Sequence, residues 1–545
     1  MAGSDGHGRA LGAIVQDVPG VVEVIAGDTD PFPGPEAGPV VTGISAHSGR
    51  VLPGYLFVAV RGTKTDGHRY IGEALERGAR ALMVDRPGVL SELRDGRLRG
   101  RQAPWVVRVA DTSVALAWAA ASFYGHPART LDVVGVTGTV GKTSVSLYLR
   151  GLLQAAGRRA GAVGSLGIFT ERGHEPSPLT TPDPITLQRA LHEMVQEGLS
   201  QAVIEVSSHG LMQHRVEAIR LAGGVITEIL PFEHAEAHPS FEHYLATKRR
   251  FLELLRPDAF LAYSAHSPHT RAMAELWPRP RRVAFALGDE IALEDAAWSV
   301  VGRIEGASLD GTRVHVRWRA PGRKDVDAVV SLHLLGAHAV HNVLGAAAAA
   351  LASGLSFERV VEGMGRLRPL PRRMNPIHRG EFTVIDDTTG HPASFEHLFQ
   401  TLEAIGAPRI VLLVGVRGSR GADINARNGR IIAAWARRLP VAAIVTTESE
   451  DAVGPGDRVE PRERDALLGA LQDVTVRIVE HRRTLEQAMR TALDIVRPGD
   501  LLVFAGAQAL NQAASLFWLH ERNSRPRGQH LPGSQASSST CRCSR

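Results

Sequence analysis

Short apolar runs alternate along the chain with longer segments in which apolar residues recur every three or four positions. The short runs predict buried β-strands, and the longer segments predict amphipathic α-helices. Repeated alternation of the two is typical of α/β layers built on parallel sheets. The clearest predicted strands are VVGVTG (133–138), QAVIEVSS (201–208), RIVLLVGV (409–416), VAAIVTT (441–447) and DLLVFAGA (500–507). The clearest predicted helices are 144–157, 184–198 and 484–496.

A chain of 545 residues is long enough for two to four domains, each with its own core. We predict an N-terminal α/β domain, a central domain with a mostly parallel sheet, and a C-terminal Rossmann-like α/β domain. Prolines and basic residues in LRPLPRRMNP indicate a linker or sharp turn before the third domain. The expected bounds are 1–110, 111–366 and 367–522, followed by a Ser/Pro/Gly-rich tail of disordered composition at 523–545.

The overall composition is that of an ordinary globular protein, with 44% hydrophobic and 22% charged residues. The net charge of +5 suggests nucleic acid at first sight, but the tail contains four arginines and no acid. Removing these four leaves about +1 for the rest of the chain. Aromatic residues are only 5%, without an RNA-binding aromatic motif. We therefore expect no nucleic-acid partner.

The two cysteines, Cys541 and Cys543, both lie in the tail. They make neither a disulfide framework nor a zinc site, so the body suits a reducing cytoplasm. The first residues lack the basic start and apolar run of a signal peptide. The longest apolar run, near 343–352, is too short to span a bilayer. We expect a cytoplasmic protein with no membrane partner.

The segment VVGVTGTVGKTS (133–144) predicts a strand, a glycine-rich turn and then a helix. Backbone N–H groups and the positive end of the helix dipole would then point toward an anion. Lys142 would reach terminal phosphates, and the hydroxyl of Thr143 or Ser144 would hold Mg²⁺. The strict phosphate-loop pattern fails, because Val136 stands where its first glycine belongs. A capped strand-to-helix turn is the alternative interpretation.

Two further segments contain residues that could bind a metal or act in catalysis, but neither segment by itself establishes a functional site. Glu205, in IEVSSHG, ends a predicted strand, where a carboxylate commonly holds the metal of a nucleotide. By itself it is equally compatible with a solvated strand end. The segment 231–251 contains His234, His238, His243 and Lys248. Without cysteines or an H-E-x-x-H motif, zinc is disfavoured, and these histidines by themselves are interpreted as solvated.

Taken in order, these motifs resemble the Mur ligases. The set is TGTxGKT[ST], TTPDP (180–184), EVSSH (205–209) and EH…H…Y-x-x-x-K, and the most similar branch is MurE. That branch adds the third amino acid to UDP-N-acetylmuramoyl-dipeptide. Its phosphate loop has the short Gly-Thr-x-Gly-Lys-Thr form, so the resemblance explains why the strict pattern fails. The segment 42–71 resembles the domain that holds the uridine end of the substrate, and the resemblance covers about residues 40–510.

The resemblance implies roles for individual positions. Those implied to be catalytic are Lys142, Glu205, His234 and Lys248. Those implied to bind ATP are Gly138, Thr139, Gly141, Lys142, Thr143, Ser144, Asn342, Arg373 and Asp387. The metal ligands for two Mg²⁺ ions are implied to be Thr143, Glu205, His234 and Lys248 as its carbamate. Those implied to contact the muramoyl-linked substrate are Ser48, Thr180, Thr181, Ser207, Arg215 and His391.

Several positions depart from the family pattern. Val140 replaces a small polar residue of the phosphate loop, and His47 and Gly49 replace the outer residues of a D-S-R triplet. Ala339 replaces an asparagine, and DDTTGHP (386–392) is nearer the DDxxHHP form of sister ligases than DYAHTP.

The acceptor-recognising motifs depart more strongly. The diaminopimelate motif D-N-P-R should fall near TTESED (446–451), which has no arginine and whose acids would repel a carboxylate. The late G-K-G-H-E motif is replaced by AGAQALN (505–511). Diaminopimelate is therefore disfavoured, and the arginine-rich stretch 415–430 is the alternative site for an acidic group.

The resemblance implies an ATP-dependent, amide-forming ligase that works through an acyl phosphate in peptidoglycan precursor synthesis. Its partners would be a UDP-muramoyl-peptide-like substrate and an amino acid, and we expect a monomer with domain closure during turnover. One alternative is a Mur-like ligase acting on another carboxylate, as in folylpolyglutamate or cyanophycin synthetases, although these lack the N-terminal domain. The other is a Mur-like ATP-binding protein without activity, which would have no need of Lys142, Glu205, His234 and Lys248 together.

Overall fold

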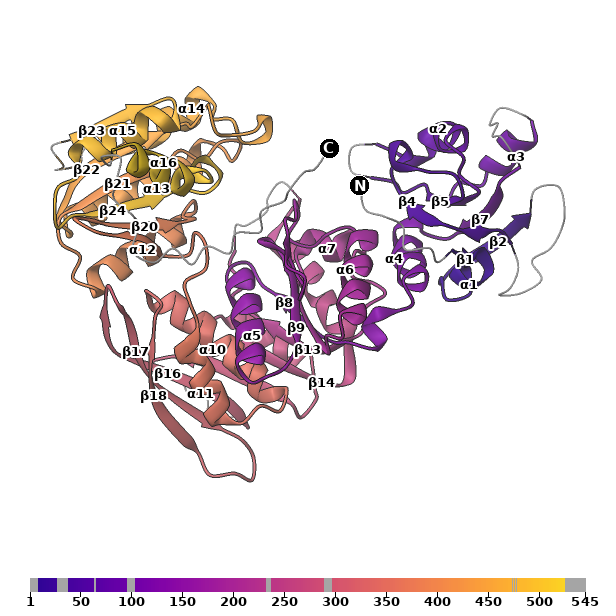
Figure 1. Cartoon of the computed structure of the whole chain (residues 1–545), viewed down its shortest axis with the longest axis horizontal. Helices are drawn as coiled ribbons and strands as arrows, with labels where there is room; N and C mark the ends of the chain where they lie inside the picture. The colour runs from indigo at the N-terminus through magenta and orange to yellow at the C-terminus, as the bar shows by residue number, and fades with distance from the viewer. Residues whose placement is uncertain are drawn as a thin grey trace. The chain divides into compact units, whose positions relative to one another are not determined.

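The structure is a computed structural model of the whole chain, and it divides into two compact units, Met1–Arg368 and Pro369–Arg545 (Figure 1). It describes residues 8–26, 38–62, 65–95, 103–231, 237–288, 297–472, 474, 476 and 478–524. The second unit starts inside the segment that the sequence marks as a linker. Each unit is built on its own β-sheets.

The first sheet of unit one lies near the N-terminus and carries helices on both faces. Its strand order is β2 (Val21–Ala26), β7 (Trp105–Val109), β6 (Ala81–Val84), β5 (Tyr55–Val58) and β4 (Gly43–Ser45). Strands β4 to β7 are parallel and β2 is antiparallel to β7. The helices are α1 (Leu11–Val15), α2 (Ile71–Glu76), α3 (Val89–Arg94) and α4 (Thr112–Phe123), and a small ribbon pairs β1 (Arg9–Ala10) with β3 (Val40–Val41). Two apolar cores, one on each face, hold this layer together.

The second sheet of unit one is large and positions most of the predicted site. Among the described residues, eleven strands pair in the order β11-β10-β9-β12-β8-β13-β14-β15-β16-β17-β18. Their bounds are β8 (Asp132–Thr137), β9 (Ala160–Gly164), β10 (Gly167–Phe169), β11 (His174–Glu175), β12 (Gln201–Glu205), β13 (Leu221–Ile226), β14 (Leu255–Ser264), β15 (Arg282–Leu287), β16 (Trp298–Ser308), β17 (Gly311–Arg319) and β18 (Val326–Leu332). Strands β9 to β16 in this order are parallel, and the two edges are antiparallel.

Helices cover this sheet and bury its apolar strands. They are α5 (Lys142–Ala155), α6 (Pro184–Gln196), α7 (Ser208–Met212), α8 (Phe241–Arg249), α9 (Pro268–Glu275), α10 (Ala337–Ala352) and α11 (Phe357–Arg366). Helix α10 packs on α5 and on β15, and Figure 1 shows α5 and α10 side by side. The Ala-rich sequence of α10 permits this close approach, because alanine adds little bulk and loses no side-chain entropy.

The C-terminal unit is a doubly wound α/β layer. Its strand order is β19 (Asn375–Arg379), β20 (Thr383–Asp387), β24 (Leu501–Ala505), β21 (Ile410–Gly415), β22 (Val441–Thr447) and β23 (Ile478–Arg482), and only β19 is antiparallel to its neighbour. The helices are α12 (Pro392–Ala404), α13 (Ala422–Ala436), α14 (Pro461–Ala470), α15 (Leu485–Ile495) and α16 (Ala513–Ser524). Helices α12, α13 and α14 pack in sequence, whereas α15 and α16 share one core against the sheet.

The strand order creates a switch point in this unit. The chain runs from β20 through α12 to β21, and β24 enters later between these two strands. The connection from β20 to β21 through α12 and the connection from β23 to β24 through α15 run in opposite directions along the sheet. Because crossovers between parallel strands are right-handed, α15 lies on the opposite face from α12. The loops after β20 and β24 therefore diverge at the carboxyl edge of the sheet, which is where open α/β sheets bind ligands.

The predicted fold class, α/β with mostly parallel sheets, is confirmed. Each of the five clearest predicted strands forms a strand, and β22 has the predicted bounds. The predicted helices are also present, with shifts of one or two residues at their ends. The shifts have a local cause: α6, for example, starts at Pro184 because the Asp183 side chain accepts the N–H groups of Ile185 and Thr186.

Candidate active site

Two glycines give the loop between β8 and α5 its shape. Gly138 and Gly141 have φ values of 144° and 87°, in the region that disfavours other residues. A Cβ at Gly138 would lie 1.9 Å from Thr227 Oγ1, and one at Gly141 would lie 2.5 Å from Asn342 Oδ1. The loop therefore lies directly against the end of β13 and against α10. Asn342, which the resemblance implies to bind ATP, is brought to the phosphate loop by α10.

The backbone of this loop is held by β13 and the residues that follow it. Thr139 N donates to Glu228 O at 2.6 Å, and Val140 forms a bridge with Glu228. Thr227 Oγ1 contacts Thr137 O at 3.1 Å and Val140 O at 2.5 Å. These contacts use the backbone of Val140 and not its side chain. The departure at position 140 therefore leaves the contacts that shape the loop intact.

The residues that open α5 point two functional groups toward this loop. Lys142 Nζ donates to Gly138 O and to Thr139 O, each at 2.9 Å. Thr143 Oγ1 donates to Glu205 Oε2 at 3.0 Å. Glu205 is the last residue of β12 and lies opposite Val136 of β8, so the parallel register places its carboxylate beside the loop. An ammonium group and a hydroxyl–carboxylate pair thus meet at the start of one helix.

Glu205 is the centre of this arrangement and is 2% exposed. Its Oε1 accepts Ser165 N at 2.8 Å, and a Cβ at Gly164 would lie 2.0 Å from the same oxygen. Ser165 Oγ also donates to Thr180 Oγ1 at 2.9 Å. Sequence reasoning missed Ser165, and the signal that identifies it is its place directly after the buried strand β9. A solvated strand end, the alternative interpretation of Glu205, does not describe this buried carboxylate.

The predicted substrate residues after Thr180 gather around the end of β12. Thr181 Oγ1 donates to Glu205 O at 2.8 Å and accepts Ser207 N at 3.0 Å. Arg215 Nη1 donates to Thr181 O at 2.6 Å. Four residues separated in the sequence thus form one polar group beside the phosphate loop.

Lys248 is buried on the other side of the loop. Its Nζ donates to Thr137 Oγ1 and to Gly138 O, each at 3.0 Å. Burial, reinforced by the nearby charge of Lys142, lowers the pKa of Lys248 well below its usual value. A lowered pKa increases the share of a buried lysine that is in the neutral, nucleophilic form. This is the form of lysine that can add to carbon dioxide.

Tyr244 contacts the phosphate loop near Lys248, and two histidines lie beside that tyrosine. Tyr244, one turn before Lys248 on α8, has its hydroxyl 2.8 Å from Thr139 Oγ1. His238 Nδ1 and His243 Nδ1 lie 3.0 Å apart. His234 lies outside the described residues. Within the part of the chain that the structure describes, no group of three or more His, Cys, Asp or Glu side chains is placed to hold a metal ion.

Ser48 is built into the N-terminal sheet layer, not into the polar group around Glu205. Its hydroxyl donates to Glu73 Oε2 at 2.7 Å, and the serine is buried. The neighbouring His47 accepts Gly49 N through Nδ1 at 3.2 Å, and so caps a short turn where the family has an aspartate. A histidine at this position can thus cap the turn, as an aspartate side chain would.

In the C-terminal unit, the predicted residues lie at the carboxyl edge of β20. Asp387 Oδ1 accepts Met374 N at 2.8 Å, and Arg373 Nη1 donates to Arg372 O at 2.9 Å. His391 accepts Ala393 N at 3.3 Å and caps α12. The same edge contains Asp386, whose pKa burial raises to about 6.

Arg372 anchors this edge and was not predicted from the sequence. Its guanidinium faces Asp386 at 3.6 Å and donates to Asn511 Oδ1, Gly506 O and Ala507 O. It therefore ties the loop after β24 to β20. The sequence offers Arg372 and Arg373 as adjacent candidates, and only the tertiary structure separates the anchoring one from its neighbour.

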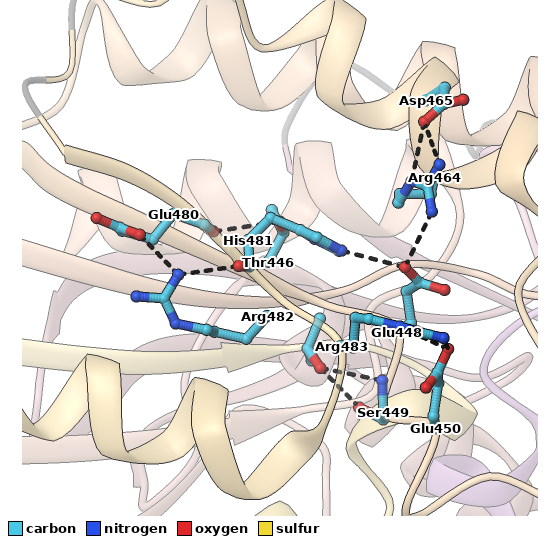
Figure 2. Close-up of polar contacts among 11 residues, drawn as sticks. Thr446, Glu448, Ser449, Glu450, Arg464, Asp465, Glu480, His481, Arg482 and Arg483 are labelled. Atoms are coloured by element: carbon cyan, nitrogen blue, oxygen red, sulfur yellow. Dashed lines mark hydrogen bonds and ion pairs between the residues drawn. The ribbon is translucent and has the colours of Figure 1, made fainter.

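The acids of TTESED are each held by a neighbour. Glu448 is buried, with Oε1 at 3.1 Å from His481 Nε2 and 3.5 Å from Arg464 Nη1, as Figure 2 shows. Glu450 pairs with Arg483. Asp451 caps α15 by accepting Leu485 N at 2.7 Å. Glu448 and Glu450 are thus paired with arginines and Asp451 with backbone N–H groups, so the repulsion expected from their sequence is reduced by partners that lie elsewhere in the chain.

A lysine-bearing phosphate loop, a strand-end carboxylate and a doubly wound C-terminal unit define the class of this protein as a nucleotide-dependent enzyme. Three family models match the chain: "Mur ligase family, catalytic domain" at 40–124, "Mur ligase middle domain" at 136–350, and "Mur ligase, glutamate ligase domain" at 372–508.

Curated relatives match almost the whole chain. A UDP-N-acetylmuramoyl-L-alanyl-D-glutamate–2,6-diaminopimelate ligase of Chlorobium phaeobacteroides is 31% identical over 509 residues, which is 91% of this chain and 91% of the relative. The ligase of the same name from a Chelativorans species is 32% identical over 487 residues, covering 88% of this chain and 92% of the relative.

Solved structures share the fold. MurF from Acinetobacter baumannii aligns with a TM-score of 0.63 at 18% identity, over 94% of this chain and 99% of that chain. MurF from Thermotoga maritima, solved in complex with ADP, aligns with a TM-score of 0.61 at 18% identity, over 88% of this chain and 98% of that chain. The chain belongs to the Mur ligase family. The predictions of family and enzyme class are confirmed, and no helix in the described ranges is long and apolar enough to cross a membrane.

Proposed function

We propose that the protein joins an amino acid to a carboxylate of a UDP-N-acetylmuramoyl-peptide-like substrate, at the expense of ATP, in peptidoglycan precursor synthesis. The observation that carries this proposal is the position of Glu205. Its carboxylate accepts the hydroxyl of Thr143 from the phosphate loop helix, and its carbonyl accepts the hydroxyl of Thr181 from the substrate side. One residue thus connects the groups proposed for ATP with those proposed for the second substrate.

The reaction has two steps. An oxygen of the substrate carboxylate attacks the γ-phosphorus of ATP, the bond to the β-phosphate oxygen breaks, and ADP leaves. The amine nitrogen of the amino acid then attacks the acyl carbon, phosphate leaves with the acyl oxygen, and the amine proton passes to solvent. The protein's main contribution is alignment and neutralisation of developing negative charge.

The residues of the loop fit the ATP part of this chemistry. Gly138 and Gly141 leave no room for a Cβ, so the backbone can approach a phosphate closely. Lys142 at the start of α5 supplies a positive charge beside that backbone. Among the remaining positions, Thr139 and Ser144 belong to the same loop and helix, and Asn342 lies against Gly141. Arg373 and Asp387 are proposed as nucleotide contacts of the C-terminal unit.

The oxygen donors of Thr143 and Glu205 fit Mg²⁺, which prefers a few carboxylate or hydroxyl ligands together with phosphate and water. When bound, Mg²⁺ would offset charge on the phosphates. Lys248 is the proposed carbamate. Its lowered pKa favours the neutral amine, whose nitrogen can bond to the carbon of carbon dioxide; the nitrogen then loses a proton to solvent, and the product is an anionic carbamate that offers oxygen ligands. His234 is proposed as a further metal ligand.

The substrate side is proposed to consist of Thr180, Thr181, Ser207 and Arg215 of the central domain, with Ser48 and His391 from the domains on either side. The match to the N-terminal family model at 40–124 supports a UDP-linked substrate. We further propose that the acceptor is not diaminopimelate, since TTESED lacks the arginine of D-N-P-R and its carboxylates are already partnered. A monomeric, cytoplasmic enzyme remains our proposal for its assembly and location.

Release of ADP with pairs of substrates tests the proposed function. The full-length protein is mixed with ATP, Mg²⁺, a UDP-muramoyl-peptide and one amino acid from a panel, and both ADP and the amide are measured. We expect ADP release that depends on both substrates and equals amide formation. ATP binding without ADP release from any pair contradicts the proposal and favours a non-catalytic role.

A further inference from the structure

A two-residue turn between β9 and β10 carries Ser165 to the carboxyl edge of the central sheet. Gly164 pairs with Gly167 in the antiparallel register, so only Ser165 and Leu166 form the turn. His174, in β11, donates from Nε2 to Leu166 O at 2.6 Å. Because the turn is short and is held by β11, the sheet itself sets the position of Ser165.

Ser165 contacts both oxygens of the Glu205 carboxylate. Its N–H donates to Oε1 at 2.8 Å, and its hydroxyl donates to Oε2 at 3.3 Å. Gly164 leaves room for this contact, since a Cβ there would lie 2.0 Å from Oε1. Ser165 is exposed, whereas Glu205 is buried. An exposed residue therefore touches the buried carboxylate that is proposed to hold Mg²⁺.

The same hydroxyl also faces the substrate side of the site. Ser165 Oγ donates to Thr180 Oγ1 at 2.9 Å, a shorter distance than the one to Glu205 Oε2. A hydroxyl has one hydrogen to donate, so these two acceptors compete for it. Thr143 Oγ1 is a second donor to Oε2, at 3.0 Å. Ser165 thus lies between the carboxylate proposed for the cation and a threonine proposed for the second substrate.

We propose that Ser165 is a positioning residue that couples the binding of ATP with Mg²⁺ to the binding of the UDP-muramoyl-linked substrate. This inference rests on the proposed function, which assigns Thr143 and Glu205 to the metal and Thr180 to the substrate. A cation at Oε2 competes with hydroxyl hydrogens for the lone pairs of that oxygen, and so leaves the hydrogen of Ser165 to Thr180. A threonine hydroxyl that accepts this hydrogen keeps its own hydrogen for the substrate. Because coupling between two sites is reciprocal, the substrate strengthens nucleotide binding by the same factor.

Calorimetric titration of the full-length protein measures this coupling without turnover. UDP-N-acetylmuramoyl-L-alanyl-D-glutamate is titrated with and without adenylyl imidodiphosphate and Mg²⁺, and the ratio of the two Kd values is the coupling factor. We expect S165A to lower the coupling factor roughly 2- to 10-fold, the value of one hydrogen bond. With EDTA in place of Mg²⁺, the coupling factor of the wild type should fall to that of S165A. S165T restores the hydroxyl and should behave like the wild type.

A double-mutant cycle tests the route through Thr180 in the metal-free protein. S165A, T180V and the double variant are each titrated with the UDP-linked substrate in EDTA. Their losses of affinity should be non-additive, because Ser165 acts on the substrate through Thr180. S331A, at an exposed serine of β18, is the control and should change neither the Kd nor the coupling factor.

The outcomes separate this inference from the proposed function. An unchanged coupling factor in S165A, or additive losses in the cycle, overturns the inference and leaves the ligase reaction standing. If both ligands bind with a coupling that S165A removes, but no amino acid gives ADP, the ligase reaction fails and the coupling role stands. If the wild type binds neither ligand, the proposed function and the inference both fail.

Discussion

Lys248 Nζ lies 3.0 Å from Thr137 Oγ1, which ties a buried amine on α8 to the last residue of β8. The same amine donates to Gly138 O, the first carbonyl of the phosphate loop. The lysine is 1% exposed, and its pKa is lowered well below the usual value by burial and by Lys142. Lys248, whose protonated form is costly to bury, therefore lies in contact with the first residues of the proposed phosphate loop.

Replacing Lys248 by methionine should stabilise the fold and abolish ligation. Without Mg²⁺ and bicarbonate, K248M removes a buried amine, and the Tm should rise by about 2–4 °C for each kcal/mol gained. In the wild type the unfolded chain binds the Lys248 proton more tightly, so stability should rise with pH toward the unfolded pKa of about 10.4. Scanning calorimetry from pH 7 to 10 should show that the stability of K248M rises less steeply with pH than that of the wild type.

The exposed Lys324 supplies the control, since K324M should change neither the slope nor the activity. K248A tests the carbamate itself: added short-chain carboxylic acid should restore part of its ligase activity. An active K248A enzyme that does not respond to bicarbonate or to acid shows that the carbamate role is wrong.

Removing the hydroxyl of Thr143 should weaken metal binding. T143V keeps the shape of the side chain but removes the hydroxyl that donates to Glu205 Oε2 at 3.0 Å, while Ser165 Oγ still donates to the same oxygen at 3.3 Å. Loss of a hydrogen bond to a charged group costs about 1.5–3 kcal/mol, so the Mg²⁺ concentration for half-maximal ADP release should rise roughly 10- to 100-fold. T143S restores the hydroxyl and should behave like the wild type. Equal Mg²⁺ requirements for T143V and T143S would remove Thr143 from the metal site.

Position 140 should tolerate change although position 141 should not. V140N keeps the backbone contacts with Thr227 and Glu228, so the KM for ATP should stay within about twofold. G141A adds a Cβ 2.5 Å from Asn342 Oδ1 at a φ of 87°, and we expect ATP binding to be lost. Fluorescent-nucleotide titration of both variants measures the difference. A strong defect in V140N would show that the valine side chain itself determines nucleotide affinity.

The carboxylate of Glu463 should stabilise the C-terminal unit in a pH-dependent way. Backbone hydrogen bonds from residues 419–421 and Glu460 lower its pKa despite the opposing effect of burial. A lowered carboxyl pKa stabilises the fold above the unfolded pKa of about 4.3, and this stabilisation is lost as the pH falls through the folded pKa. E463A leaves buried N–H groups unpaired and should cost about 2–4 kcal/mol at pH 7.

Hydrogen exchange of the amides of 419–421 in the full chain measures this effect locally. The difference in protection between wild type and E463Q should shrink as the pH falls below about 4.3. E381Q, at an exposed glutamate of the same unit, serves as the control and should leave protection unchanged. A difference that is constant with pH would mean that the shape of Glu463, and not its charge, holds the loop.

Much of the architecture follows from local patterns. Period-two and period-3.6 apolar spacing predicts the main strands and helices because burial of one face needs only nearby residues. Lys142 and Thr143 can be assigned from sequence since strand, glycine loop and helix are contiguous. Arg372 and Glu463 could not, because nothing in their own segments distinguishes them from other polar residues.

The sequence by itself determined the order of the domains, the α/β class, the family motifs and the identity of the groups that could carry chemistry. Tertiary structure alone decided which of these groups meet. The register of β12 beside β8 buries Glu205, and Glu448 of TTESED is paired with His481 of β23 and Arg464 of α14. The physical reason is that desolvation and ion pairing depend on distances in space, and residues far apart in the chain set those distances only after the sheets have formed.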